Sequence, residues 1–195
     1  MILSNVEVFR ALDDKRLIIR PEPVPRVPTV GQSHSPYDTH SVDLSLGNEI
    51  TVPSGGQFTY DLTEPGRIAD TIRQHSQTIQ ISDLQPFCLK PNRFVLGKTF
   101  EWVELPILPD RPTCLAARIE GKSSRARFGI LIHFTAPTVH PGFKGTLTLE
   151  MINLGPASFM LRPGMAIAQL IIEEVKGCPI ANPSQFQGQQ NPAGA

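Results

Sequence analysis

A short run of small, hydroxyl-bearing and cationic residues is the first candidate for chemistry in this sequence. From Gly121 to Arg127 the chain reads GKSSRAR, which joins a flexible glycine to two serines, one lysine and two arginines. Phosphate groups are bound by such mixtures of hydroxyls, main-chain N–H groups and guanidinium forks. The spacing of a P-loop is absent. The run therefore predicts either a phosphate-binding segment or a solvated basic turn.

A glutamate inside an apolar strand is the second candidate. Residues 146–153 read TLTLEMIN, so Glu150 shares one face of the expected strand with Thr148, while two leucines and Met151 share the other. A carboxylate in such a place is unfavourable to bury unless it is paired or hydrogen-bonded. Glu150 is therefore expected either to form a structural ion pair or to have a pKa tuned for proton transfer.

The composition limits the classes of function. Formal charge is balanced, with 18 basic and 18 acidic residues, which argues against a bulk electrostatic grip on nucleic acid. No apolar run reaches the ~18 residues of a membrane span. The first residues lack the pattern of a signal peptide, so a cytoplasmic protein without membrane contact is expected. Three widely spaced cysteines without a CxxC motif predict neither a disulfide framework nor a zinc site.

The chain pattern predicts one all-β domain with short helices. A length of 195 residues suits one domain, and 19 prolines among short β-branched runs are typical of a barrel or sandwich. The expected parts are a helix over 4–15 with Ser4 and Glu7 as a capping box, a proline-rich arm over 21–36, a β-barrel core over 40–176 and a flexible tail over 177–195. Within the core, strands are expected over 40–52, on both sides of a turn at 90–92, and over 113–120, 129–134, 146–153 and 165–175, with a short helix over 68–74.

Two polar residues inside expected strands have ordinary explanations. Asp43 is expected on the wet face of the strand over 40–52, and a structural or functional polar contact is the alternative. His133 interrupts the apolar run over 129–134. A satisfied core or interface histidine is expected there rather than a catalyst.

Several motifs in a fixed order resemble the dCTP deaminases of the dUTPase-like superfamily. They are SVDLSLG near residue 43, GKSSRAR, TAPTVHPGFKGTLTLEMIN, LRPGMAIAQL and FQGQ near residue 187. The resemblance implies a distorted β-barrel or jelly roll that assembles as a homotrimer with active sites between subunits. It also implies hydrolytic deamination of dCTP to dUTP and ammonia without zinc, with magnesium accompanying the triphosphate.

The resemblance implies a role for individual residues as well. Glu150 would be the general acid/base that acts on the ring N3, the attacking water and the leaving ammonia. Ser123 and Arg127 would help to hold the water and orient this glutamate, and the carbonyl of Ala136 would position the water. The residues expected to contact substrate are Lys122, Ser123, Ser124, Arg125, Ala126, Arg127, His140, Phe143, Thr148, Leu149, Glu150, Gln169 and Gln189.

Two departures from the family's pattern keep alternatives open. His140 stands where most members carry an acidic residue, which disfavours dUTP hydrolysis, whereas Phe143 stands where an aromatic ring commonly packs against deoxyribose. The tail reads Ser184-Gln185-Phe186 where the family often has Ser-Lys-Tyr, which removes a cation from the triphosphate site. The alternatives are a dUTPase-like or bifunctional deaminase–diphosphatase, and a catalytically weak nucleotide-binding trimer.

Overall fold

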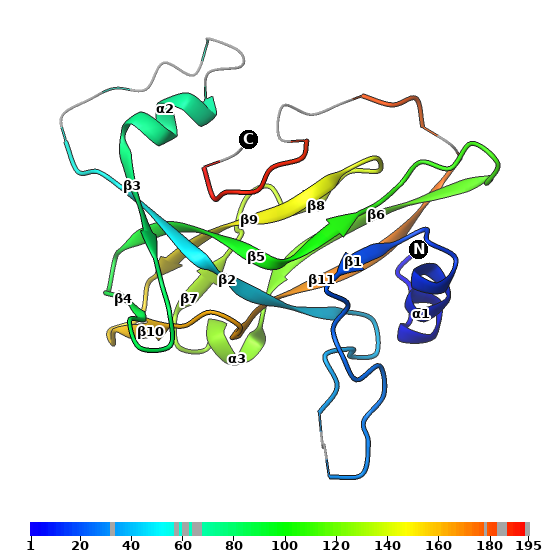
Figure 1. Ribbon diagram of the computed structural model, residues 1–195, viewed down its shortest axis with the longest axis horizontal. Helices are drawn as coiled ribbons and strands as arrows, with labels where there is room; N and C mark the ends of the chain where they lie inside the picture. The colour runs from blue at the N-terminus through cyan, green and yellow to red at the C-terminus, as the bar shows by residue number, and fades with distance from the viewer. Residues whose placement is uncertain are drawn as a thin grey trace.

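The computed structural model describes residues 1–31, 34–56, 59, 63, 68–177, 179–182 and 187–193. Within these residues the chain forms a curled antiparallel sheet with short helices at its margins (Figure 1). The prediction of an all-β fold with short helices is confirmed. The longest of these helices has nine residues, and none has the length and hydrophobicity that a membrane span requires.

The structure contains most of the expected helices and strands together with several short strands that were not predicted. The helices are α1 (Asn5–Asp13), α2 (Ile68–Gln74) and α3 (Ser123–Ala126). The strands are β1 (Ile18–Arg20), β2 (Val42–Pro53), β3 (Ser76–Gln80), β4 (Phe87–Leu89), β5 (Phe94–Glu104), β6 (Thr113–Gly121), β7 (Ile130–Ile132), β8 (Thr138–Val139), β9 (Lys144–Asn153), β10 (Phe159–Leu161) and β11 (Ala166–Lys176).

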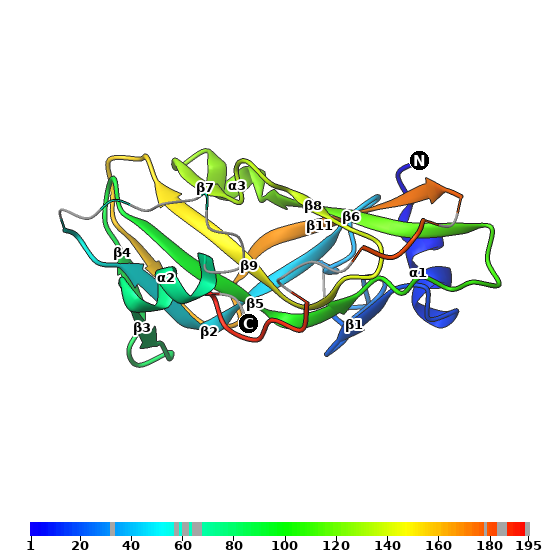
Figure 2. The same ribbon diagram turned by 90° about the horizontal axis from the view of Figure 1, so that it is seen from above.

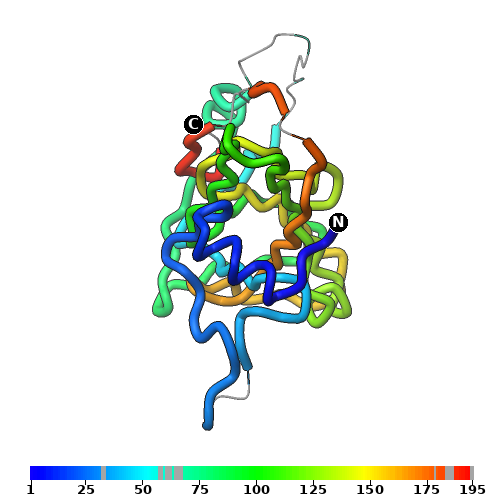
Figure 3. Tube along the Cα trace, turned by 90° about the vertical axis from the view of Figure 1, so that its right-hand side faces the viewer, coloured from blue at the N-terminus to red at the C-terminus, as the bar shows by residue number. Residues whose placement is uncertain are grey.

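The main sheet has the strand order β7-β9-β5-β2-β11-β6-β8, with β1 paired to β5 and β3 paired to β2. β4 pairs with β10 in a separate small sheet, so the two strands expected around the turn at 90–92 both form but do not pair with each other. Seen from above, the sheet is elongated, with α1 near one end and α2 near the other (Figure 2). The described parts of the proline-rich segment, 21–31 and 34–36, extend away from the sheet (Figures 1 and 3).

The alternating pattern of β9 determines which side chains reach the core. Leu147, Leu149 and Met151 are buried, whereas Thr148 and Glu150 are partly exposed and lie on the other face. Burial of each large apolar side chain contributes roughly 1.5–3 kcal/mol. A slip of one residue would turn the leucines outward and the carboxylate inward. The apolar face of β9 therefore holds Glu150 on the opposite side.

β2 departs from the predicted alternation at its start. Val42, Asp43 and Leu44 are all buried, because β2 lies in the middle of the sheet between β5 and β11. Asp43 is only 8 % exposed, so the prediction of a wet-face position was wrong. Its carboxylate contacts the ammonium of Lys122 and lies 3.4 Å from Nε2 of His34. The buried charge is thus paired, as its desolvation requires.

α1 confirms the expected helix but not its expected cap. Ser4 occupies the N-cap position without a side-chain capping hydrogen bond to any described residue. Glu7 instead pairs with Arg10, at 2.5 Å. Val8 and Ala11 are buried against the core, and this packing stabilises a helix too short to persist alone.

β7 is shorter than predicted. It ends at Ile132 because His133 has a φ of 55°, in the left-handed region that a strand does not use. The backbone turns away at this point and carries the histidine out of the strand.

Candidate active site

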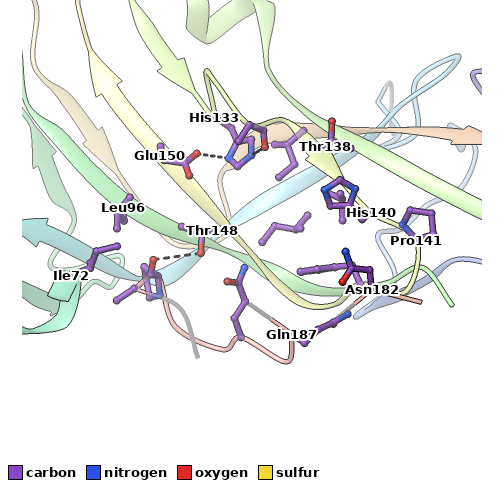
Figure 4. Close-up of a pocket in the computed structure, with 18 residues that line it drawn as sticks. Ile72, Leu96, His133, Thr138, His140, Pro141, Thr148, Glu150, Asn182 and Gln187 are labelled. Atoms are coloured by element: carbon purple, nitrogen blue, oxygen red, sulfur yellow. Dashed lines mark hydrogen bonds and ion pairs between the residues drawn. The ribbon is translucent and has the colours of Figure 1, made fainter. Parts of the chain in front are cut away.

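A pocket of about 440 Å³ opens beside β9. Its walls come from β5 and β9, from residues 133–143 and from the C-terminal residues 187–193 (Figure 4). Leu96, Phe143 and Leu147 contribute apolar surface, and Glu150 contributes a carboxylate. Small-molecule sites usually combine such apolar walls with few polar groups, in volumes of about 300–1,000 Å³.

Glu150 meets His133 in this pocket. Oε2 of Glu150 lies 2.5 Å from Nδ1 of His133, and Nε2 of the same ring lies 2.7 Å from the carbonyl oxygen of Ala136 (Figure 4). The contact at Nδ1 has the distance of an ion pair without the alignment of a regular hydrogen bond. The main chain joins the same pair, because the N–H of His133 donates to the carbonyl of Glu150 at 2.8 Å.

The surroundings of His133 favour its cationic form. Burial lowers the pKa of its imidazole, but the contact with the Glu150 carboxylate, that group's charge and the Ala136 carbonyl together raise the pKa above its usual value. His133 is mostly buried and has contacts at both ring nitrogens, as expected of a core histidine, but it also lines the pocket, which the sequence did not indicate. The pairing of β7 with β9 through Ile132 and Met151 brings this histidine beside Glu150, and no local sequence pattern signals that pairing.

Five other residues expected at the site line the same pocket. They are Ala136, His140, Phe143, Thr148 and Gln189. The hydroxyl of Thr148 lies 3.5 Å from the carbonyl oxygen of Pro192 in the C-terminal segment. Leu149 was expected to contact the base through its backbone, and its side chain is buried in the core.

The residues that were expected to bind phosphate lie outside this pocket. None of residues 121–127, all of which the structure describes, lines the pocket. Gln169 lies with them rather than with Glu150, because in β11 it is the register partner of Glu120 in β6 and of Asp43 in β2. The single chain therefore presents two separate groups of candidate residues.

The run over 121–127 is mostly open to solvent in the single chain. Lys122 precedes α3 and pairs with Asp43, so the predicted phosphate ligand already has an ionic partner. Arg125 is partly buried, and its Nε has no hydrogen-bond partner among the described residues. The exposed members are Ser123, Ser124, Ala126 and Arg127.

The C-terminal segment covers one side of the pocket. The amide of Gln189 donates to the carbonyl of Thr146 at 2.7 Å, and the N–H of Thr146 donates back to the carbonyl of Gln189 at 3.1 Å. The ammonium of Lys98 donates to the carbonyl of Gln190 at 2.7 Å. The tail was expected to be flexible unless it docked, and residues 187–193 are docked. Residues 184–186, where the tail motif departs from the family, lie outside the described residues.

Metal ligands are not grouped in the part of the chain that the structure describes. There, no set of three or more His, Cys, Asp and Glu side chains is arranged to hold a metal ion. The expectations about zinc and magnesium stay predictions.

Comparison with known proteins assigns the chain to a family. Residues 2–175 match a family model described as dCTP deaminase-like. The chain belongs to the dCTP deaminase family. One dCTP deaminase, from Thermomicrobium roseum, is 35 % identical over 199 residues, which cover 98 % of this chain and 91 % of that protein. The resemblance seen in the motifs is thereby confirmed.

Other members of the dCTP deaminase family extend the comparison. A protein named "dCTP deaminase, dUMP-forming" from Dictyoglomus turgidum is 36 % identical over 171 residues, covering 87 % of this chain and 78 % of that protein. The crystal structure of 2'-deoxycytidine 5'-triphosphate deaminase from Agrobacterium tumefaciens aligns with a TM-score of 0.64 at 17 % identity. That alignment covers 89 % of this chain and 48 % of the other, so this chain spans about half of its length. It confirms the predicted fold.

Proposed function

We propose that this chain hydrolyses dCTP to dUTP and ammonia. One observation carries the proposal: in a member of the dCTP deaminase family, the carboxylate of Glu150 lies in the wall of a pocket, linked through His133 to the carbonyl of Ala136. A carboxylate beside a main-chain acceptor is suited to hold and deprotonate one water molecule. The partly apolar pocket would take the flat base.

Glu150 is the proposed general acid/base. Its protonated form would donate to N3 of the cytosine ring, which makes C4 electrophilic. The carboxylate would then take a proton from the water that attacks C4. It would then pass a proton to the 4-amino group, and the C4–N bond would break to release ammonia. As the C4 carbonyl of dUTP forms, the carboxylate would take the proton of the C4 hydroxyl. The sum is dCTP and water to dUTP and ammonia, and the carboxyl group returns to its starting state.

Ala136 and His133 would hold the reacting groups in place. A carbonyl oxygen has two lone pairs, so that of Ala136 can accept the Nε2–H of His133 and still accept a water molecule. His133 would restrict the rotation of the Glu150 side chain, which is 34 % exposed. Restricting a catalytic carboxylate in this way lowers the entropy lost on reaching the reactive geometry.

The remaining pocket residues would recognise the nucleoside. Thr148 and Leu149 would contact the base edge through their main-chain groups, because β9 runs along the pocket beside Glu150. Phe143 would pack against the deoxyribose, and His140 would contact the sugar hydroxyl. Gln189 would close the site from the C-terminal segment.

A homotrimer with shared sites would unite the two groups of residues. Lys122, Ser123 and Arg127 do not line the pocket of their own chain, yet phosphate recognition and orientation of Glu150 require them near it. A neighbouring subunit could supply them. Four large apolar side chains, Phe128, Phe134, Leu154 and Met160, are exposed in the single chain, which supports a contact between subunits. Magnesium would enter bound to the triphosphate.

A bifunctional enzyme is the second candidate. The dUMP-forming relative from Dictyoglomus turgidum has an identity to this chain similar to that of the dCTP deaminase from Thermomicrobium roseum, over a shorter alignment, and this favours further hydrolysis of dUTP. His140 argues against that step, because an exposed histidine in the pocket replaces the acidic residue expected to activate water for it.

The test is product analysis with the purified chain. Protein would be incubated with Mg²⁺ and dCTP, with dUTP and dCMP in parallel, and the products separated by chromatography. Conversion of dCTP to dUTP with dUTP left intact is the expected result. Formation of dUMP and pyrophosphate would favour the bifunctional enzyme. Nucleotide binding without turnover would overturn the enzyme assignment.

A further inference from the structure

The turn over residues 140–143 carries three pocket residues, His140, Pro141 and Phe143, and is held on both sides. On the inner side the N–H of Gly142 donates to the carbonyl of Leu105 at 2.6 Å, and the N–H of Leu105 donates to the carbonyl of Phe143 at 2.9 Å. These two bonds fix the turn to the residue that follows β5. The other side of the turn contacts the C-terminal segment.

Gln187 holds the outer side with both ends of its side-chain amide. Nε2 donates to the carbonyl oxygen of Gly142 at 2.8 Å, and Oε1 accepts the N–H of Lys144 at 3.1 Å. These two main-chain groups flank Phe143 in the sequence. A primary amide supplies one acceptor and a donor group side by side, which matches this carbonyl and N–H.

Hydrogen bonds hold the main chain next to Gln187 against β9. The N–H of Gly188 donates to the carbonyl of Lys144 at 2.8 Å, and Gln189 exchanges main-chain and side-chain bonds with Thr146. A Cβ atom at Gly145 would lie 3.1 Å from the carbonyl oxygen and 3.2 Å from the nitrogen of Gln189. The main chain of residues 188 and 189 therefore packs directly against the main chain of β9. The side chain of Gln187 extends from this segment to the turn.

We infer that Gln187 is a positioning residue that sets the preference of this site for 2'-deoxyribonucleotides over ribonucleotides. The inference rests on the proposed function. An aromatic ring excludes a 2'-hydroxyl only if it cannot move back, because a hydroxyl pressed against the ring loses its hydrogen bonds to water. The amide of Gln187 bonds the residues on both sides of Phe143, so it limits that movement.

The test compares dCTP with CTP in matched variants. Gln187→Ala removes both amide bonds. Gln190→Ala is the control, because the side chain of Gln190 is exposed and its bond to Lys98 uses the main-chain carbonyl. We expect the ratio of kcat/KM for dCTP to that for CTP to fall at least about tenfold in Gln187→Ala, a scale typical of discrimination over one hydroxyl. In Gln190→Ala the ratio should match that of the wild type.

A purely structural role would lower both kcat/KM values together and leave their ratio unchanged, and that result would overturn the inference. Should Gln187→Ala fold poorly, Gln187→Glu serves in its place. It keeps an acceptor for the N–H of Lys144 but sets a carboxylate oxygen against the carbonyl of Gly142. The same fall in the ratio is expected.

Calorimetric binding of dCTP and CTP separates this inference from the proposed function. A wild-type chain that binds dCTP more tightly than CTP but does not deaminate it would overturn the proposed reaction alone. The ratio of the two Kd values should then still fall in Gln187→Ala, and an unchanged ratio would overturn the inference. Equal binding of the two nucleotides by the wild type, or no binding of either, would also overturn it.

Discussion

Nδ1 of His133 lies 2.5 Å from the carboxylate of Glu150, while Nε2 of the same ring lies 2.7 Å from the carbonyl oxygen of Ala136. Both partners are hydrogen-bond acceptors. A neutral imidazole has only one N–H donor, so only the cationic ring can satisfy both contacts. The raised pKa of His133 follows from this arrangement, against the opposing effect of burial.

Glu150→Gln should fold and bind nucleotide but lose deamination by at least about 10²-fold. The amide keeps the shape of the side chain and cannot take a proton from water. Ammonia release from dCTP measures the loss. Glu7→Gln is the control, because Glu7 is partly exposed on α1, pairs with Arg10 and does not line the pocket. Near-normal turnover in Glu150→Gln would remove this carboxylate from the mechanism.

Loss of the charge on His133 should weaken the fold as pH rises. The folded-state pKa lies above the usual value of 6.5, so the ion pair with Glu150 contributes its full stability below about pH 6.5 and loses it as pH rises through the folded-state pKa. Urea unfolding at pH values from about 5.5 to about 9, in steps of about half a unit, measures this free energy.

In His133→Asn the decline of unfolding free energy above about pH 6.5 should be smaller than in the wild type. His40→Asn is the control, because His40 is exposed and contacts Thr39. It should keep the wild-type pH dependence. An identical decline in His133→Asn and wild type would show that the pair with Glu150 does not carry this effect.

If each active site is shared between subunits, a mixture of two inactive variants should recover activity. Glu150→Gln damages the pocket, and Arg127→Ala damages the run over 121–127 that does not line it. When the two chains are unfolded and refolded together, mixed trimers would contain some sites with both parts intact. We expect deaminase activity well above that of either variant refolded alone, which should be about 10²-fold below wild type.

Light scattering of the wild type should give the mass of three chains. Each variant refolded with itself is the control for the mixing experiment. Activity that never rises on mixing, in chains shown to exchange subunits, would place both parts of the site in one subunit.

Gly155→Ala should lower the free energy of unfolding. Gly155 packs against Phe128, the residue that follows the run over 121–127. An added Cβ would lie 2.0 Å from the carbonyl oxygen of Phe128, a main-chain atom that cannot move without displacing the chain after α3. The expected loss is about 1–3 kcal/mol of unfolding free energy. Gly55→Ala is the control, since a Cβ there meets no atom of the described residues within 4 Å. Equal stability of the two variants in urea would contradict the close approach.

Much of this protein follows from local sequence pattern. The alternation TLTLEMIN was sufficient to predict β9 and to set Glu150 opposite the leucines, because successive side chains of a strand point to opposite faces. The order of the motifs was sufficient to indicate the family, and the family comparison confirms it. Helix α2 was likewise predicted over the residues that form it.

The tertiary structure decided the rest, because strand pairing joins residues that are distant in sequence. Alternation predicted a wet Asp43, but neighbours on both sides of β2 bury it and leave Lys122 as its partner. The pairing of β7 with β9 and the left-handed backbone of His133 bring that ring to Glu150. The local sequence around His133 does not show which strand pairs with β7. The ion pair between His133 and Glu150 could therefore be found only in the folded chain.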